Sequence, residues 1–302
     1  MDHPEPTINS AAYVACPACG HSDTAPLDWS GSWQGRSFGL VKCLKCGSLT
    51  TSPTPDPAYL RRFYETSFDY RWYADHSSGK NADAAERATE LADVMEGKVL
   101  DLGGGIGYLS RALAGKDIAA VSHDPFAPGS QRQLRPGEFG TVTCMHVLEH
   151  VADPLQFLRN ARDLLQPAGR IVLAVPNASG SGYRVQGMSW IWAQPPITHL
   201  HHFTPGGLLA LLDRAGFQNP SVSFHDRWDA NCRSDIECAR ATRLVDALWG
   251  LPVLSAIPSW RKLAAWASTR RRTWQLREAR KTVVPDTDRA ELHVIAEKAG
   301  EK

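Results

Sequence analysis

The stretch Val99-Leu-Asp-Leu-Gly-Gly-Gly-Ile-Gly107 decides the fold of this 302-residue chain. A short apolar strand ends at an acidic residue, Asp101, and a tight turn then leads into a helix expected over residues 108–114. The turn needs glycines because a ligand has to lie against bare backbone there, and the alternate ones are Gly103, Gly105 and Gly107. Such glycines alone would also suit a dinucleotide. The acid directly before the turn favours instead a ligand that carries an ammonium group and no pyrophosphate.

A second acidic residue, Asp124, follows the next apolar stretch, which is expected to be a strand over residues 118–121. An acid at the tip of that strand can accept hydrogen bonds from both hydroxyls of a ribose. The alternative is that Asp124 is an ordinary loop residue before Pro125, because Asp117 and His123 blur the register.

Strands and helices keep alternating beyond this point. Residues 141–150 begin as a strand, and Asp153-Pro154 then caps a helix. A strand over 171–175 follows, Thr204-Pro205 starts another capped helix, and residues 291–297 form a last strand. This alternation predicts an α/β fold with a mainly parallel sheet and right-handed crossovers.

Residues 147–154, Val-Leu-Glu-His-Val-Ala-Asp-Pro, carry a resemblance to a known family. They are similar to the Val-Leu-Glu-His-Val-x-Asp-Pro pattern of class I methyltransferases that use S-adenosylmethionine (SAM). The resemblance implies a Rossmann-like sheet. It also carries the family's binding roles over to this chain: the residues around the methionine moiety would be Asp101, Gly103, Gly105 and Gly107, and the residue at the ribose Asp124.

The chain departs from that family between Asp124 and residue 140. The usual fold places a helix and a third strand there, with an acid that contacts adenine. The prolines and glycines of this stretch make regular structure unfavourable. We therefore expect the sheet to be one strand short, and the residues that contact adenine stay unassigned.

Two Cys-x-x-Cys-Gly motifs stand near the start of the chain, with the cysteines Cys16, Cys19, Cys43 and Cys46. Two residues between cysteines let both thiolates reach one metal, and the glycine permits the tight turn. Four sulfur ligands close a tetrahedral site, so we expect a zinc ribbon over residues 1–50 with a structural zinc; a redox dithiol is the alternative. Together with the core, this module is similar to bacterial methyltransferases that pair a four-cysteine module with this catalytic domain, some of which act on nucleotide-linked sugars.

Candidate catalytic residues stand in two places. Glu149 and His150 follow the strand that begins at residue 141, which corresponds to the fourth strand of the family's fold. They are expected at the sheet edge where open α/β folds bind ligands. His199 precedes the helix that starts at Thr204, in a segment that resembles the acceptor side of these enzymes. The resemblance makes His199 the expected general base, a role that suits a near-neutral pKa. Alternatively, the histidines of this segment only pack and cap the helix.

The same region also suits a metal-dependent mechanism. His146, Glu149, His150 and a later histidine resemble the Glu-x-x-Glu-His pattern with a distant histidine of metal-dependent methyltransferases, except that His146 replaces the first Glu. A divalent cation held there would polarise an acceptor hydroxyl. The long stretch 177–198 is expected to close over the acceptor.

These motifs divide the chain into a zinc ribbon (1–50), a linker with helices (51–97), a SAM-binding core (98–225), a helical insertion (226–285), and a last strand with tail (286–302). The net charge is +1, but the insertion concentrates basic residues next to an uncharged stretch with tryptophan. That pairing makes residues 245–281 a candidate for peripheral membrane contact, with packing on the core and RNA binding as alternatives. We expect a cytoplasmic protein, because no signal peptide or membrane-spanning stretch is evident.

Together these features predict a SAM-dependent methyltransferase that acts on oxygen or carbon of a small polar acceptor, such as a nucleotide- or lipid-linked sugar. An RNA methyltransferase is the alternative enzyme. However, the strand that begins at residue 141 lacks the Asn/Asp-Pro-Pro-aromatic motif of many base-amine methyltransferases, so nucleic acid is the less favoured partner. A SAM-fold scaffold without activity is the non-enzymatic alternative. The sequence leaves the oligomeric state open.

Overall fold

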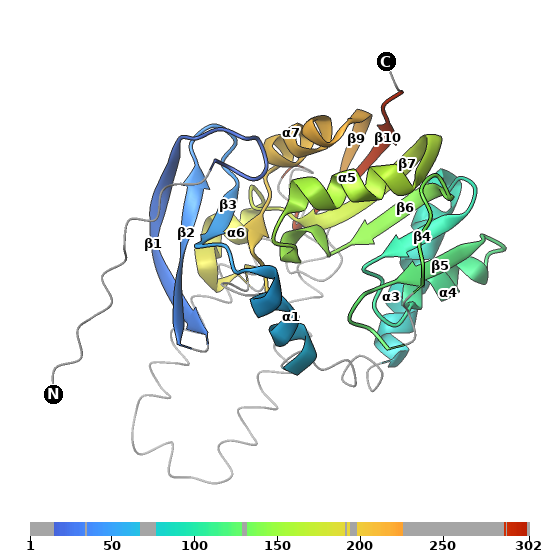
Figure 1. The fold of residues 1–302 in the computed structure, drawn as a ribbon, viewed down its shortest axis with the longest axis horizontal. Helices are drawn as coiled ribbons and strands as arrows, with labels where there is room; N and C mark the ends of the chain where they lie inside the picture. Colours follow the sequence, from blue (N-terminus) through green and yellow to red (C-terminus); the bar gives the residue numbers. More distant parts are fainter. Residues whose placement is uncertain are drawn as a thin grey trace, which may run out of the picture.

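The structure is a computed structural model that describes residues 15–33, 35–66, 77–128, 132–190, 192–193, 198–225, 287 and 289–300. A small antiparallel sheet lies at one end of the molecule, and a larger twisted sheet with helices around it forms the rest (Figure 1).

The large sheet has six strands in the order β5-β4-β6-β7-β10-β9. Their bounds are β4 Val99–Leu102, β5 Ala120–His123, β6 Phe139–Met145, β7 Leu165–Pro176, β9 Phe217–His225 and β10 Glu291–Lys298. β4 pairs in parallel with β5 and β6, and β6 with β7, whereas β10 is antiparallel to both β7 and β9. The expected α/β fold with a mainly parallel sheet is confirmed. Among the described residues, no strand stands between β5 and β6 in the sequence, as the prolines and glycines predicted.

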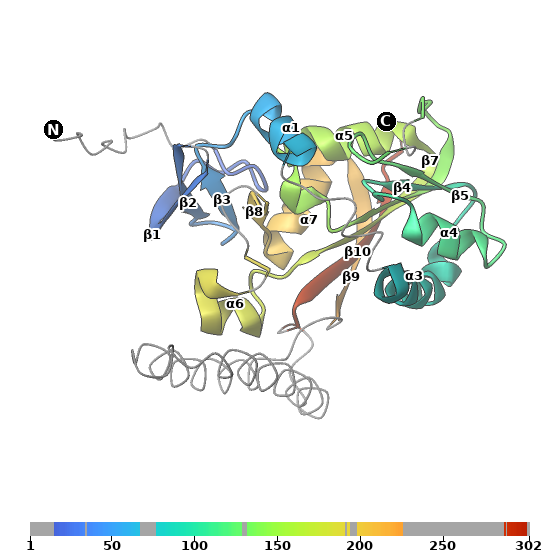
Figure 2. The ribbon, with the colours of Figure 1, turned by 90° about the horizontal axis from the view of Figure 1, so that it is seen from below.

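Helices cover both faces of this sheet (Figure 2). On one face lie α3 Ser77–Leu91, which continues into the short 3-10 helix Ala92–Val94, and α4 Tyr108–Ala114. On the other lie α5 Pro154–Leu164 and α7 Pro205–Ala215. Both predicted caps form: Gln156 N donates to Asp153 Oδ1 at 2.9 Å, and Gly207 N donates to Thr204 Oγ1 at 3.1 Å.

Two strand boundaries differ from the expectation. β5 starts at Ala120 and not at residue 118, because the amide of Ile118 still closes the turn after α4 by donating to the Leu113 carbonyl at 3.2 Å. β7 starts at Leu165 and not at residue 171, because the buried Leu165 already pairs with β6.

The small sheet has the order β1-β2-β3-β8, with β1 Thr24–Trp33, β2 Arg36–Cys43, β3 Leu49–Ser52 and β8 His201–His202. The first three strands and the two cysteine turns before β1 and β3 make up the ribbon, which we take as residues 15–52. β8 comes from the core, immediately before α7. The fourth strand of the ribbon's sheet is therefore supplied by a segment about 150 residues away in the chain.

The ribbon and the large sheet share one hydrophobic core. Cys16, Ala18 and Cys43 belong to the same buried cluster as residues of the large sheet and α7, among them Leu173, Leu208 and Leu211. α1 Pro57–Thr66 follows the ribbon, with Asp56 as its cap accepting from Tyr59 N at 2.8 Å, and it buries Tyr59 and Leu60 against Phe38 and Leu200. The ribbon is therefore packed into the core and is not an appendage on a flexible tether.

The remaining described elements are the 3-10 helix Leu148–His150, α6 Ser181–Gln186 and the 3-10 helix Gly187–Ser189. The expected helical insertion 226–285, with the candidate membrane contact at 245–281, lies outside the described residues. In the part of the chain that is described, no helix is long and apolar enough to cross a membrane.

Candidate active site

Asp101 lies at the carboxyl end of β4, behind the glycine loop (residues 103–107). Asp101 is 2% exposed, and Thr143 Oγ1 on β6 donates to Asp101 Oδ1 at 3.1 Å. Burial raises the pKa of Asp101 to about 6, although the Thr143 hydrogen bond acts in the opposite direction. The charged form of this carboxyl therefore costs folding free energy, which is a sign of a functional group.

The glycine loop is shaped by close neighbours. Gly103 has a φ of +76°, and a Cβ there would lie 2.5 Å from Val147 Cγ2. Gly105 has a φ of +55° but no atom within 4 Å of such a Cβ, so its backbone is open to a ligand. Gly107, with a φ of +83°, precedes the first residue of α4.

Asp124 directly follows β5 and is bonded to the glycine loop. Gly105 N donates to its Oδ2 at 3.0 Å, and Phe126 N donates to its Oδ1 at 2.9 Å. The structure thus brings the second predicted acid to the first predicted motif. This contact favours a place in the cofactor site over the alternative of an ordinary loop residue.

A hollow of about 540 Å³ lies beside Asp124 and is lined by Arg61, His123, Pro125, Arg132 and Gln133. The stretch after β5, which takes the place of a third strand, forms most of it. α1 contributes Arg61 to the lining. Tyr64 of the same helix stacks on Phe126, with the ring centroids 4.9 Å apart. Sequence reasoning missed this part of the site because α1 comes from the linker and has no motif of its own.

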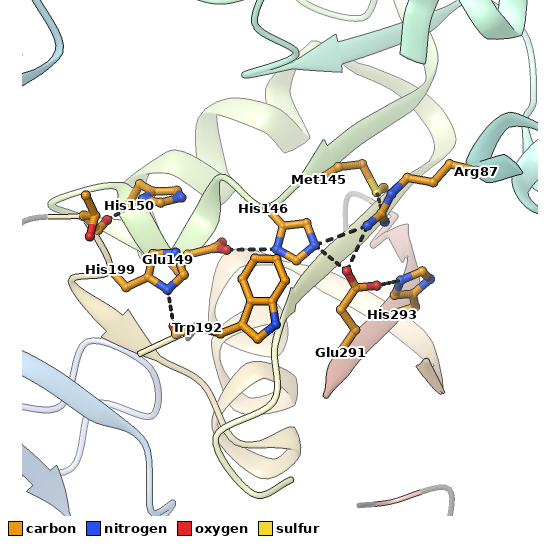
Figure 3. A network of polar contacts seen from close by, with 10 residues as sticks. Arg87, Met145, His146, Glu149, His150, Trp192, His199, Glu291 and His293 are labelled. Carbon is orange, nitrogen blue, oxygen red and sulfur yellow. Dashed lines mark hydrogen bonds and ion pairs between the residues drawn. The ribbon is translucent and has the colours of Figure 1, made fainter. Parts of the chain in front are cut away.

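Glu149 lies fully buried in the 3-10 turn after β6. His146 Nδ1 bonds to its Oε1 at 3.2 Å, whereas its Oε2 has no hydrogen-bond partner among the described residues (Figure 3). Burial alone would raise the pKa of Glu149, but the hydrogen bond from His146 and the neighbouring histidines outweigh it and lower the pKa to about 2. A buried carboxylate oxygen without a partner is costly, and it marks a place where a ligand or cation can bind.

His150 and His199 lie beside Glu149, and each is oriented by a backbone carbonyl. His150 Nδ1 bonds to the Thr198 oxygen, and His199 Nδ1 bonds to the Trp192 oxygen. A carbonyl only accepts, so both Nδ1 atoms carry the proton and each Nε2 presents a lone pair. Burial lowers the pKa of His199 to about 3, so its imidazole is neutral.

Three of the predicted side chains therefore meet at one point: one ligand atom each from Glu149, His150 and His199 lie within 4.8 Å of one another. We call these residues the Glu-His-His cluster. The two imidazole rings meet edge to face, with centroids 4.7 Å apart.

His146, the first residue of the metal-dependent pattern, is not part of this cluster. Its Nδ1 bonds to Glu149 and its Nε2 bonds to Glu291 Oε1 at 2.5 Å, so both nitrogens are engaged by carboxylates. Burial alone would lower the pKa of His146, but Glu291 and Glu149 outweigh it and raise the pKa to about 9. His146 is thus a partly exposed cation between two carboxylates, which does not fit the role of a metal ligand.

Glu291 connects His146 to two further residues that sequence reasoning missed (Figure 3). Arg87 Nη2, from α3, donates to Glu291 Oε1 at 2.8 Å, and His293 Nε2, two residues along β10, bonds to Glu291 Oε2 at 2.7 Å. All three side chains are at most 6% exposed. An acid directly before the apolar residues of the last strand was the available signal, but nothing in the sequence names its partners.

The four cysteines come together as predicted. Cys16 Sγ lies 3.7 Å from Cys46 Sγ, and Cys19 Sγ lies 3.5 Å from Cys43 Sγ. Tetrahedral zinc with four sulfurs at about 2.3 Å requires sulfur–sulfur distances of roughly 3.8 Å, so the arrangement fits such an ion. Gly20 and Gly47 close the two turns with φ of +77° each.

Comparison with known proteins identifies the family to which the chain is similar. The sequence model of a family described as a methyltransferase domain matches residues 73–222. The ubiquinone biosynthesis O-methyltransferase of Xanthomonas euvesicatoria pv. vesicatoria is 32% identical over 179 residues, which cover 49% of this chain and 74% of that protein. The protein of the same name from Ralstonia nicotianae is 27% identical over 162 residues, covering 44% and 67%.

Among solved structures, the Burkholderia thailandensis 1,6-didemethyltoxoflavin-N1-methyltransferase, with bound 1,6-didemethyltoxoflavin and S-adenosylhomocysteine, matches with a TM-score of 0.49 and 15% identity, covering 90% of this chain and 99% of that one. A SAM-dependent methyltransferase from Archaeoglobus fulgidus matches with a TM-score of 0.42 and 16% identity, covering 80% of this chain and all of that one.

Proposed function

Since this chain belongs to the class I SAM-dependent methyltransferases, we propose that it transfers the methyl group of SAM to a hydroxyl oxygen of a small acceptor held at the Glu-His-His cluster. The two relatives described above are named O-methyltransferases, which supports oxygen as the methylated atom. A sugar hydroxyl is one acceptor of this class, and the chemistry below applies to any hydroxyl that has to lose its proton.

SAM is proposed to lie along the glycine loop. The open backbone at Gly105 admits the methionine moiety, and Asp101 supplies negative charge for its ammonium group. Asp124 faces the ribose hydroxyls, since a carboxylate oxygen that takes one backbone hydrogen bond still has accepting capacity.

The Glu-His-His cluster is the observation that carries the proposal. The Nε2 atoms of His150 and His199 are not the atoms held by the backbone carbonyls, and a carboxylate presents a buried oxygen without a partner among the described residues. The Nδ1–H groups are bonded to carbonyls, as in histidines that ligate metals. We propose that this cluster holds a divalent cation, which would lower the pKa of an acceptor hydroxyl beside it. The hydroxyl proton would then pass to water, the oxygen would take the methyl group, and S-adenosylhomocysteine would be released.

This proposal changes the role expected for His199 from a lone general base to one of three ligands. The difference can be measured directly. Purified full-length protein is titrated with Mn²⁺ by calorimetry, alongside Glu149→Ala and the control His21→Ala, which removes a histidine outside the cluster. We expect the Glu149 variant to lose about 10²-fold or more in Mn²⁺ affinity and the control to keep it.

Turnover with labelled SAM is then measured on small hydroxylated compounds, nucleotide-linked sugars and RNA. Methylation of a small hydroxyl that is stimulated by Mg²⁺ or Mn²⁺ supports the proposal. If the turnover rate does not change when cations are added but is lost in His199→Ala, His199 acts as a general base and not as a metal ligand. Methylation of RNA alone contradicts a small acceptor.

We also propose that the four cysteines hold one structural zinc. Purified protein should contain about one zinc per chain by elemental analysis, and Cys43→Ser should contain none, because a site that has lost one of four thiolates binds zinc far more weakly. Four freely reactive thiols in the folded protein would contradict this.

A further inference from the structure

The second cysteine turn is bonded directly to the start of α7. Thr204 Oγ1 donates to the Cys46 carbonyl at 2.6 Å, and Thr204 N donates to Ser48 Oγ at 3.2 Å. Ser48 is 3% exposed and Thr204 8%. The residue that caps α7 is therefore held on one side by the turn that carries two of the four cysteines.

A second set of bonds runs through β3, the strand that leaves this turn. Leu49 and Thr50 pair with His202 and His201, and Thr51 N donates to the Leu200 carbonyl at 2.8 Å. The amide of Leu200 in turn donates to the Glu149 carbonyl at 2.8 Å. Leu200, next to His199, is thus bonded to the ribbon on one side and to the Glu-His-His cluster on the other.

The segment between these bonds has little structure of its own. β8 is two residues long, and a pair of that length is not stable unless its partner strand is already in place. Among the described residues, the ribbon buries four apolar side chains besides its cysteines, those of Ala18, Phe38, Leu40 and Leu49, which is a small core, and modules of this kind depend on their metal to fold.

We propose that the metal-loaded ribbon positions residues 199–204, so that metal at the four cysteines is required for methyl transfer but not for SAM binding. The cofactor side is expected to be independent because Asp101, the glycine loop and Asp124 are bonded to one another and to β6. The turnover part of this inference rests on the proposed role of the Glu-His-His cluster. The structural part does not, and it is tested separately.

The structural test is hydrogen exchange on the full-length protein, comparing the zinc-loaded wild type with Cys43→Ser. Using the variant and not a chelator keeps a cation at Glu149 out of the comparison. We expect the amides of Thr51, Leu200 and Thr204 to exchange at least about tenfold faster in the variant, while the amides of β4 and β6 keep their protection.

A second variant avoids the cysteines. Thr204→Val removes both the cap and the bond to Cys46, Thr204→Ser keeps both, and Asp153→Ala removes the matching cap of α5, which makes no bond to the ribbon. Thr204→Val should lower kcat about tenfold with SAM affinity within a factor of about three, and Thr204→Ser should restore kcat.

The outcomes separate the inference from the proposed function. Faster exchange at residues 199–204 together with a loss of kcat supports the inference. Unchanged exchange in zinc-free protein, or loss of SAM binding in parallel with kcat, overturns it. If no acceptor is turned over at all, the proposed function fails, while the exchange experiment still decides whether the ribbon holds this segment.

Discussion

The two halves of the proposed active site are built in opposite ways. The cofactor half, made of Asp101, the glycine loop and Asp124, comes from one continuous piece of chain, and its main contacts join neighbouring parallel strands. The acceptor half, made of the Glu-His-His cluster and His146, depends on the ribbon, α3, β8 and β10 (Figure 3). One half is local in the sequence, and the other is assembled from distant segments.

The two halves also depend on different physical forces. Tight sterics around glycines shape the cofactor half, whereas buried charges and backbone hydrogen bonds shape the acceptor half. Steric changes should therefore mainly reduce affinity, and changes to buried charges should mainly reduce stability.

The largest effect is expected from Glu291→Gln, at the outer end of the acceptor half. The change removes the carboxylate that Arg87 and His146 share and leaves Arg87 only Asp83 at 3.7 Å and His146 only Glu149; breaking a buried pair such as Arg87 and Glu291 costs about 3–5 kcal/mol. Denaturant unfolding measures it. Glu297→Gln on the same strand is the control, since its bond to Asn219 is exposed and its loss should cost less than about 0.5 kcal/mol. Equal losses for both would mean that the buried network is not a special feature of β10.

Gly103→Val, in the cofactor half, should reduce SAM affinity and leave the fold intact. The added side chain meets Val147 and occupies a left-handed backbone position, so we expect SAM affinity to fall by about 10²-fold or more while the sheet still folds. Calorimetry with SAM measures this. The matched control is Gly137→Ala, which has a φ of +66° with nothing near its Cβ and lies outside the site; it should keep SAM affinity. A Gly103 variant that binds SAM normally would place the cofactor elsewhere.

His199→Ala separates the two halves most cleanly. Turnover should fall by about 10²-fold, whether His199 ligates a cation or accepts the proton, because either role acts only on the acceptor. SAM affinity should stay within a factor of about three, since no contact joins His199 to the glycine loop among the described residues. Parallel losses of SAM binding and turnover would show that the halves are not independent.

The smallest effect is a gain in stability from Asp101→Asn, and it depends on pH. The folded-state pKa of Asp101 is raised from 3.8 to about 6, so the folded protein binds the extra proton between these values and stability falls as the pH rises through 6. The amide removes the cost of the buried charge. The variant should be at most about 3 kcal/mol more stable than the wild type at pH 8 and equal to it at pH 4. It should bind SAM more weakly at pH 8, and a variant that is less stable there would contradict the burial argument.

The local half is also the half that the sequence predicts well. Asp101, the glycines and Asp124 lie in adjacent turns of one βαβ unit, so their spacing alone brings them together. The caps at Asp153 and Thr204 and the four cysteines are predicted for the same reason, because each motif is complete within a few residues. Even here one boundary differs from the expectation: β5 begins at Ala120 and not at residue 118, because Ile118 belongs to the turn after α4.

The acceptor half is predicted only in its composition. Glu149, His150 and His199 are named by the sequence, but the orientation of both histidines depends on the Trp192 and Thr198 carbonyls, which no motif specifies. The pairing of β3 with β8 and the partners of Glu291 depend on tertiary packing and have no local signal. The metal-ligand role open to His146 in the sequence is not favoured, because Glu291 occupies its second nitrogen.

The strand that β8 adds to the ribbon has a consequence for how the protein is made. At about 5–20 residues per second, a ribosome needs roughly ten to thirty seconds to add the 150 or so residues that separate β3 from β8. During that interval β3 is an exposed edge on the growing chain, open to pairing with another chain. The N-terminal module, although translated first, is completed only when residue 204 has left the exit tunnel. Early zinc capture by the nascent chain, or a chaperone that covers this edge, would therefore govern the yield of correctly folded protein.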